Sequence, residues 1–322
     1  MKSSQGMLLG LVGVVLFSLT LPMTRLAVVD LDPVWVGLAR ALFAAGPAAL
    51  WLWWVRAPVP SRAEFPQLLR VAGGIVVGFP TLTSMALRHV DASHAAVMLG
   101  VLPLATALCG AWLAGERPSR AYWLSALAGA ALVVAFALRE GGGTLQWADA
   151  LLAGAVLAAG FGYAEGARVA RRLGSPGTIC WTLVASAPLL LVPVLWLSWQ
   201  HGVHARASAW LGFAYVTLFS QLLGFFAWYK ALALGGIARV SQVQLLQLFL
   251  TLVFATLLNG DVPGAGTWAF GALVVGVVAL GGRTAITMAP VAVAAPVAAA
   301  ARGATGPIQA TVPRGATNKE RP

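Results

Sequence analysis

Long stretches without any charged residue constrain this chain more than any other feature. Ten windows of fifteen or more residues within positions 3–282 contain no Asp, Glu, Lys or Arg. They are 3–24, 41–55, 71–87, 92–115, 121–138, 150–164, 173–205, 207–229, 240–260 and 262–282. A helix needs about 20 mostly apolar residues to cross a bilayer, and the apolarity here is continuous rather than alternating, which excludes barrel strands. The windows therefore predict an all-α integral membrane protein with ten transmembrane helices.

The composition supports this class. Hydrophobic residues make up 59% of the chain, charged residues only 10%, and the mean hydropathy is +0.83, whereas soluble domains carry about 25% charged residues. The net charge of +11 comes from basic residues scattered singly between apolar runs, so we expect no nucleic-acid partner. Cys109 and Cys180 each lie inside an apolar run, and we expect no disulfide, metal site or cofactor.

A duplication divides the chain. The segment Ala86–Trp123 reappears without gaps 145 residues later, and Leu8-Leu9 reappears as Leu151-Leu152 at an offset of 143. We predict a first five-helix repeat over 5–140, a second over 147–284, and a flexible basic Ala/Pro-rich cytoplasmic tail over 285–322. Because five is odd, the second repeat must run upside down relative to the first, as in many secondary transporters.

Basic residues predict the orientation in the membrane. With the N-terminus inside, twelve Lys and Arg residues before the tail fall on the cytoplasmic side and four fall outside. The twelve are Lys2, Arg56, Arg62, Arg70, Arg117, Arg120, Arg168, Arg171, Arg172, Lys230, Arg239 and Arg283, and the four are Arg25, Arg88, Arg139 and Arg206. Both termini are expected to be cytoplasmic.

The repeated frame resembles a known family. Ala92–Ala96, Leu102-Pro103, Gly115–Pro118 and Trp123, with Gly260-Asp261 in the second half, resemble the EamA repeat of the drug/metabolite transporter superfamily. The resemblance implies a ten-helix carrier of the bacterial inner membrane that moves a small-molecule substrate across the lipid bilayer, often by export. It names no substrate, and it leaves proton coupling and a homodimer open. Two positions depart from the pattern, because Asp261 replaces a Glu and Leu248 replaces a Pro.

Polar residues of the ninth span are the first candidates for substrate binding. Ser241, Gln244, Gln247 and Thr251 lie at i, i+3, i+6 and i+10, which keeps them roughly on one helix face. Amides can donate and accept hydrogen bonds without carrying charge, so this face suits a polar substrate. The alternative is that these side chains only bond to neighbouring helices. In the first repeat, Leu99 and Leu102 stand where Gln244 and Gln247 stand in the second, which marks an asymmetric site.

Two charges lie within predicted spans. Glu165 is expected in the cytoplasmic third of the sixth span, where it could bind substrate or exchange a proton, or instead form a structural pair with Arg168 or Arg40. Arg40 is expected near the outer end of the second span, where the family resemblance implies a structural or gating role and direct substrate contact is the alternative. In the eighth span, Gln221 and Trp228 share a face and could contact a planar substrate, although plain helix packing is an equal alternative.

Other functional classes fit the sequence less well. A multidrug or cation efflux carrier would need an acid at the cavity centre, and Glu165 is expected too far toward the cytoplasm. The runner-up from another class is a membrane-embedded lipid-handling enzyme. However, the chain has no acidic DDxxD-type cluster, no P-loop and no pair of deep carboxylates. We therefore expect no enzyme but a secondary transporter that exports a small polar or amphipathic metabolite, such as an amino acid, by alternating access.

Overall fold

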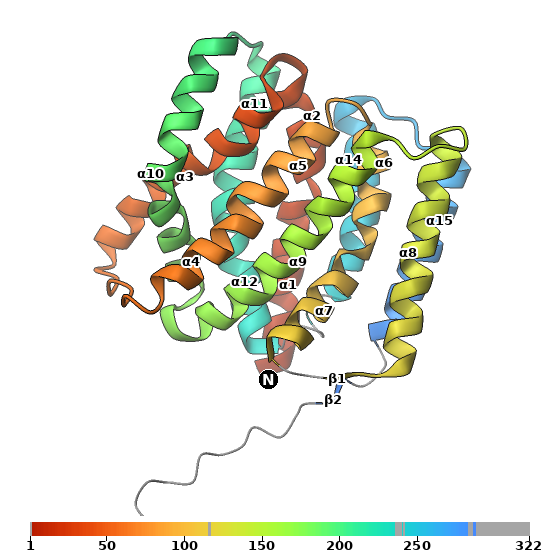
Figure 1. Cartoon of the computed structure of the whole chain (residues 1–322), viewed down its shortest axis with the longest axis horizontal. Coiled ribbons are helices and arrows are strands. Elements are labelled where there is room, and N and C mark those ends of the chain that lie inside the picture. Colours follow the sequence, from red (N-terminus) through yellow and green to blue (C-terminus); the bar gives the residue numbers. More distant parts are fainter. Residues whose placement is uncertain (1, 115–116, 236–239, 241, 283–285, 288–322) are drawn as a thin grey trace, which may run out of the picture. The chain divides into compact units, whose positions relative to one another are not determined.

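The computed structural model describes residues 2–114, 117–235, 240, 242–282 and 286–287. The chain divides into one compact unit over residues 1–288 and a second over 289–322, and the second lies outside the described residues. The expected tail over 285–322 is thus outside the description except for two residues. Everything below concerns the first unit, which is a bundle of long helices (Figure 1).

The helices and strands have the following bounds. They are α1 (Lys2–Ser18), α2 (Thr20–Asp30), α3 (Pro33–Trp54), α4 (Phe65–Val71), η1 (Ala72–Gly78), α5 (Phe79–Ala86), α6 (Ala92–Met98), η2 (Leu99–Val101), α7 (Leu102–Ala114), β1 (Arg117–Pro118), α8 (Arg120–Glu140), α9 (Trp147–Leu173), α10 (Ser175–His201), α11 (Ala207–Tyr215), η3 (Val216–Leu223), α12 (Gly224–Gly235), η4 (Gln242–Gln244), α14 (Leu245–Asn259), α15 (Ala265–Gly282) and β2 (Ile286–Thr287).

The elements join into spans that match the ten charge-free windows. Eight continuous helical stretches of the described chain are long and apolar enough to cross a membrane, and the shorter apolar helices α14 and α15 follow them. Several spans consist of more than one helical element in direct succession. The elements α1 and α2 form one span, as do α4, η1 and α5, and also α11, η3 and α12. The expected all-helical membrane fold is confirmed.

The two halves are alike and run in opposite directions. Helix α1 rises from the end of the bundle where the N-terminus lies, which we call the N-terminal end, whereas α9 runs from the opposite end back toward it (Figure 1). Irregular segments recur at matching places: the π-helix η3 begins 144 residues after the π-helix η1, and the 3₁₀ segment η4 begins 143 residues after the 3₁₀ segment η2. Since such segments depend on local sequence and packing, their recurrence indicates two inverted copies of one unit.

Small residues let the helices approach closely. Gly74 in η1 lies against α9, where an added Cβ would come within 2.6 Å of the Ala158 carbonyl oxygen and 2.8 Å of Gly162 Cα. An added Cβ on Gly162 would in turn lie 2.5 Å from Ile75 Cγ2. The two helices therefore touch at Gly74 and Gly162, and no larger residue fits between these two backbones.

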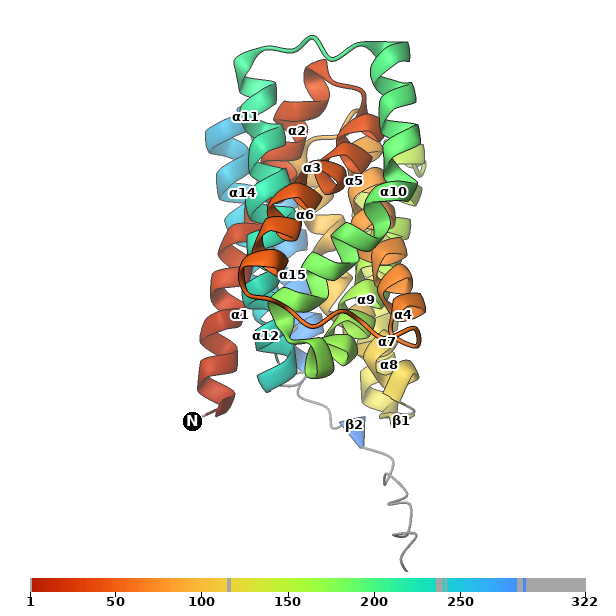
Figure 2. The same cartoon turned by 90° about the vertical axis from the view of Figure 1, so that its left-hand side faces the viewer.

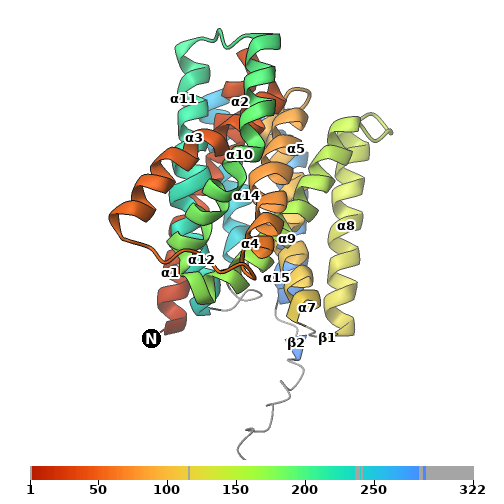
Figure 3. The same ribbon diagram turned by 60° about the vertical axis from the view of Figure 1, so that its left-hand side comes forward.

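Polar contacts hold the ends of the bundle. At the opposite end, where the α10–α11 connection crosses over (Figure 2), Arg206 Nε donates to Asp30 Oδ2 at 2.9 Å, and this hydrogen bond raises the pKa of Arg206. At the N-terminal end, β1 pairs antiparallel with β2 and so joins the chain after α7 to the chain after α15. Helix α8 lies at the edge of the bundle (Figure 3) and packs beside α15 (Figure 1), and many of its apolar side chains are exposed, as expected of a surface that faces lipid.

Candidate functional site

A small cavity lies in the middle of the bundle, between the two halves. It measures about 10 Å³, which is about the space that one water molecule needs. Its lining residues are Phe17, Thr20, Arg40, Ile75, Phe79, Tyr163, Ser220, Gln221, Phe225 and Gln247. They come from spans of both repeats, so we call this space the central cavity. At this size it holds no metabolite, and the structure is a closed conformation.

Arg40 is the charged residue of the central cavity. Its side chain is 1% exposed, although it belongs to a membrane-spanning helix. Nη2 donates to Ser220 Oγ at 3.0 Å, and Ser220 Oγ lies 2.8 Å from Thr20 Oγ1. Nε and Nη1 are buried and have no hydrogen-bond partner among the described residues. Arg40 is the eighth of the 22 residues of α3, and there it lines the cavity between the halves.

Gln221 connects the two π-helical segments. Its Nε2 donates to the carbonyl oxygen of Ile75 at 3.2 Å, so a side chain of η3 contacts the backbone of η1. Its Oε1 is buried and has no partner among the described atoms. A π-helix shifts the backbone hydrogen-bond register and frees a carbonyl, and here the amide of the other repeat occupies one. The unpaired Oε1 remains available to a ligand.

Aromatic rings form one wall of the central cavity. The Phe17 ring lies 5.1 Å from the Phe225 ring and 6.4 Å from the Tyr163 ring, measured between centroids. Trp228 is fully buried behind them, with centroid distances of 6.1 Å to Phe17 and 5.7 Å to Tyr163. Trp228 does not line the cavity, and its indole N–H has no partner among the described residues. The rings offer flat apolar surface to a ligand and position one another.

A second small cavity adjoins the first through Gln247, which lines both. It measures about 20 Å³ and is lined by Leu21, Ala96, Leu99, Gly100, Leu102, Gln244, Gln247, Leu248 and Thr251. Both amide atoms of Gln244 and the Oε1 of Gln247 are buried without a partner in the described chain. The structure thus brings the two glutamines together with Leu99 and Leu102, their counterparts in the first repeat. Ser241 lies outside the described residues.

Two of these polar residues also contact the backbone of the first span. Thr251 Oγ1 donates to the Ser18 carbonyl oxygen at 2.9 Å, which is the interhelical hydrogen bond considered as the alternative role for this face. Gln247 Nε2 lies 3.5 Å from the Phe17 carbonyl oxygen, the outer limit for a hydrogen bond. Thr251 is therefore satisfied by the fold, whereas the glutamines retain unpaired groups.

Glu165 lies away from both cavities. Its carboxylate is buried and accepts from Arg70 Nη2 at 2.7 Å and from Arg168 Nη1 at 3.1 Å, while the two arginine side chains are about half exposed. The structural pairing considered for Glu165 is thus present with Arg168, and Arg70 joins it in place of Arg40. The geometry therefore gives Glu165 a structural role between these helices, and its part in proton coupling stays a prediction.

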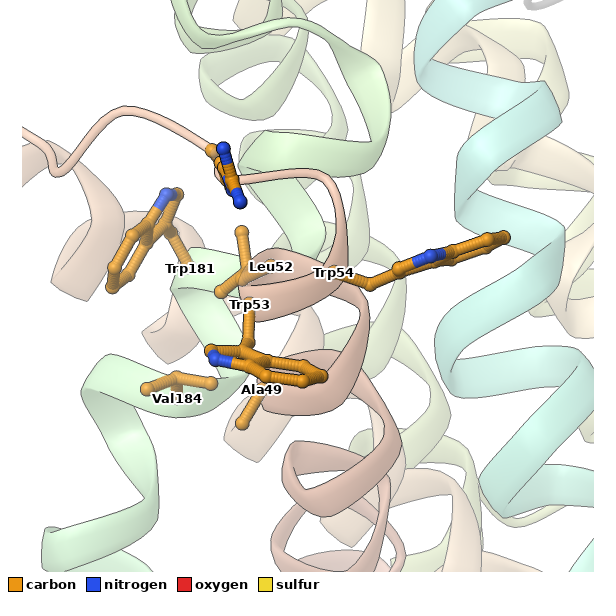
Figure 4. A pocket seen from close by; sticks show the side chains of 8 residues that line it. Ala49, Leu52, Trp53, Trp54, Trp181 and Val184 are labelled. Atoms are coloured by element: carbon orange, nitrogen blue, oxygen red, sulfur yellow. The ribbon is translucent and has the colours of Figure 1, made fainter.

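Two other pockets lie at the surface, away from the central cavity. A groove of about 580 Å³ runs between α3 and α10, lined by residues such as Trp53, Trp54, Trp181 and Arg56 (Figure 4). It is far larger than the central cavity, but it carries exposed tryptophans of the kind that anchor a protein at the membrane interface. At the opposite end, a polar pocket of about 120 Å³ includes His94, whose Nε2 lies 2.7 Å from Asp149 Oδ1.

Sequence reasoning missed several cavity residues. Thr20 and Tyr163 are counterparts at the repeat offset of 143, and both line the central cavity, so the duplication itself could have paired them. Ser220 could have been found as a polar residue in the middle of an apolar window. Phe17 gave no signal, because one Phe among many apolar residues is not distinctive.

Comparisons with known proteins agree with this architecture. The EamA-like transporter family matches residues 4–138 and again residues 146–281. A Bacillus subtilis (strain 168) protein, "Uncharacterized transporter YdeK", is 43% identical over 277 residues, covering 86% of this chain and 96% of the relative. One crystal structure of another protein superposes with a TM-score of 0.60 at 23% identity, over 86% of this chain and 96% of that one, and supports the fold alone. The chain belongs to the EamA-like transporter family.

Proposed function

We propose that this membrane transporter exports a small polar or amphipathic metabolite, such as an amino acid, by alternating access. In this proposal it is a multi-pass protein of the bacterial inner membrane with both termini in the cytoplasm. The N-terminal end of the bundle is then the cytoplasmic end, and the central cavity is the substrate site. The basic residues gathered on one side of the membrane support this orientation.

One observation carries the proposal: buried, unpaired polar groups converge where the two repeats meet. They are Nε and Nη1 of Arg40, Oε1 of Gln221, both amide atoms of Gln244 and Oε1 of Gln247. Each unpaired buried polar group costs about 1–3 kcal/mol of stability, so a bundle that only needed to fold would not collect them at its centre. A polar substrate that replaces its water with these groups would satisfy them.

The small cavity volume supports alternating access. At about 10 and 20 Å³, neither cavity admits a metabolite, so the halves must separate to load and release one. Inverted repeats provide two equivalent ways of separating, one toward each side of the membrane. The closed bundle is then the intermediate between them.

The lining disfavours the alternative of cationic drug efflux. No carboxylate lines either cavity among the described residues, and the charge that does is the cation of Arg40. A ligand cation about 5 Å from that guanidinium would be repelled by about 3 kcal/mol at an effective dielectric constant of about 20. No feature of the described residues favours the lipid-handling enzyme.

The test replaces the glutamines by the residues of the other repeat. The double variant Gln244→Leu/Gln247→Leu gives the second repeat the side chains that Leu99 and Leu102 already provide at the matching place in the fold. We expect it to insert and fold, and to lose at least about tenfold in transport rate, because each lost hydrogen bond to substrate is worth about 0.5–1.5 kcal/mol.

The measurement has two stages. Cells that overexpress the native chain are screened against toxic amino-acid, nucleoside and drug analogues, where export gives resistance. The substrate so identified is then followed in liposomes for the native chain, the double variant and the control Leu99→Met/Leu102→Met, which alters the same cavity without changing its polarity. Transport by the double variant at the native rate would exclude the glutamines from the site, and liposomes that move no solute would contradict the transporter itself.

A further inference from the structure

We propose that the central cavity selects organic anions, and that Arg40 is the charge partner of a carboxylate on the transported molecule. This inference rests on the proposed function, since it names the substrate class of the same site. The ligand it describes is a small monocarboxylate with an apolar or aromatic body. Three independent features of the cavity support it.

The first feature is the missing counter-charge. Arg40 is 1% exposed, and no ion pair to it occurs among the described residues. Its single hydrogen bond, to Ser220, leaves one N–H on Nε and two on Nη1 without partners. Charged residues within membrane spans are normally paired, because isolated charges are costly there. The partner that the described residues do not provide is therefore supplied by the ligand, and a carboxylate matches both the charge and the hydrogen-bond donors.

The second feature is the inverted repeat. At the offset of 143, Pro33 at the start of α3 corresponds to Pro176 at the start of α10, and Arg40 corresponds to Leu183. Leu183 is fully buried, as Arg40 is. The same structural position is thus filled by an apolar residue in one half and by a cation in the other. The fold does not require a charge there, so the charge serves what the cavity holds.

The third feature is the rest of the cavity wall. The rings of Phe17, Tyr163 and Phe225 line the same cavity as the guanidinium and add apolar surface, and the unpaired Oε1 atoms of Gln221 and Gln247 can accept hydrogen bonds. A carboxylate at Arg40 therefore leaves an apolar body against the rings. An inorganic anion such as chloride would satisfy Arg40 but would use neither the rings nor the amides.

The test compares three probes that share one skeleton and differ in charge. Purified full-length protein in detergent is titrated with 3-phenylpropionate, 3-phenylpropionamide and 3-phenylpropylamine, with chloride as the inorganic anion, and binding is followed by calorimetry. We expect the carboxylate to bind at least about tenfold more tightly than the amide, because a hydrogen bond to a charged group is worth about 1.5–3 kcal/mol, which corresponds to about 10- to 150-fold. The amine should not bind measurably.

Variants at position 40 give the control. Arg40→Leu, which copies Leu183, should lose the preference for the carboxylate, whereas Arg40→Lys should keep part of it because the charge remains. Equal affinity for the carboxylate and the amide in the native chain, or a preference that survives in Arg40→Leu, would overturn the inference. So would chloride binding that displaces the carboxylate with equal affinity, since the cavity would then hold an inorganic ion.

Liposome flux separates this inference from the proposed function. If the carboxylate binds through Arg40 but neither it nor any metabolite of the screen crosses the membrane, the anion site is supported and the proposed transport function is refuted. If a neutral or cationic metabolite is transported at the same rate by the native chain and Arg40→Leu, transport stands and anion selection is wrong.

Discussion

Replacing Arg40 by Met should make the bundle more stable. The substitution removes two buried nitrogen groups that have no partner among the described residues, Nε and Nη1, and each such group costs about 1–3 kcal/mol. It also removes the hydrogen bond to Ser220, worth about 1.5–3 kcal/mol, but leaves Ser220 bonded to Thr20. With central values of about 4 kcal/mol gained and about 2 lost, the free energy of unfolding should rise by about 2 kcal/mol.

The assay is reversible unfolding in mixed detergent micelles with increasing SDS, followed by circular dichroism. Leu183→Met is the matched control, because it changes the same position of the other repeat without removing a charge, and such swaps usually cost less than about 1.5 kcal/mol. Stability gained together with loss of ligand binding is the signature of a residue kept for function. If Arg40→Met instead lowers the free energy of unfolding by about 1 kcal/mol or more, Arg40 is a structural residue and the reasoning above is refuted.

Two further substitutions test the rest of the bundle. Glu165→Gln should lower the free energy of unfolding by about 1–2 kcal/mol, less than for a fully buried pair because Arg70 and Arg168 are about half exposed. If Glu165 is only structural, the pH profile of transport in liposomes stays unchanged, whereas an altered profile would support the coupling role. Gly74→Ala should cost about 1–3 kcal/mol, because its Cβ meets the backbone of α9. Gly73→Ala, whose Cβ meets nothing within 4 Å, should be neutral or slightly stabilising, and equal melting curves for the two variants would contradict the contact.

Much of the fold could be predicted because the bilayer leaves few choices. Apolar windows of membrane-spanning length must be helices, and a duplication of an odd number of spans must be inverted. The spacing of Gln244, Gln247 and Thr251 also predicted correctly that these side chains share a face, since all three line one cavity. That they contact substrate stays a prediction.

That Arg40 lines the central cavity could not be predicted by the same reasoning. Counting along one helix gives a depth in the membrane, but the location of a cavity depends on how several helices lean against one another. The ion pair of Glu165 could not be predicted either, because its partner Arg70 is 95 residues away in the sequence and no periodicity connects the two. The π-helical segments carry no sequence pattern that distinguishes them from the α-helix around them.

Those segments have a mechanical consequence. A π-helical hydrogen bond links residues i and i+5 instead of i and i+4, so a span can change its local rotation by exchanging one pattern for the other. A span that contains such a turn can therefore rotate its two ends against each other while its backbone stays hydrogen-bonded within the lipid. η1 and η3 give this freedom to one span of each repeat, and the hydrogen bond from Gln221 to Ile75 couples the two. A rotation of one span would then have to break this hydrogen bond or move the other span with it, and both residues line the central cavity.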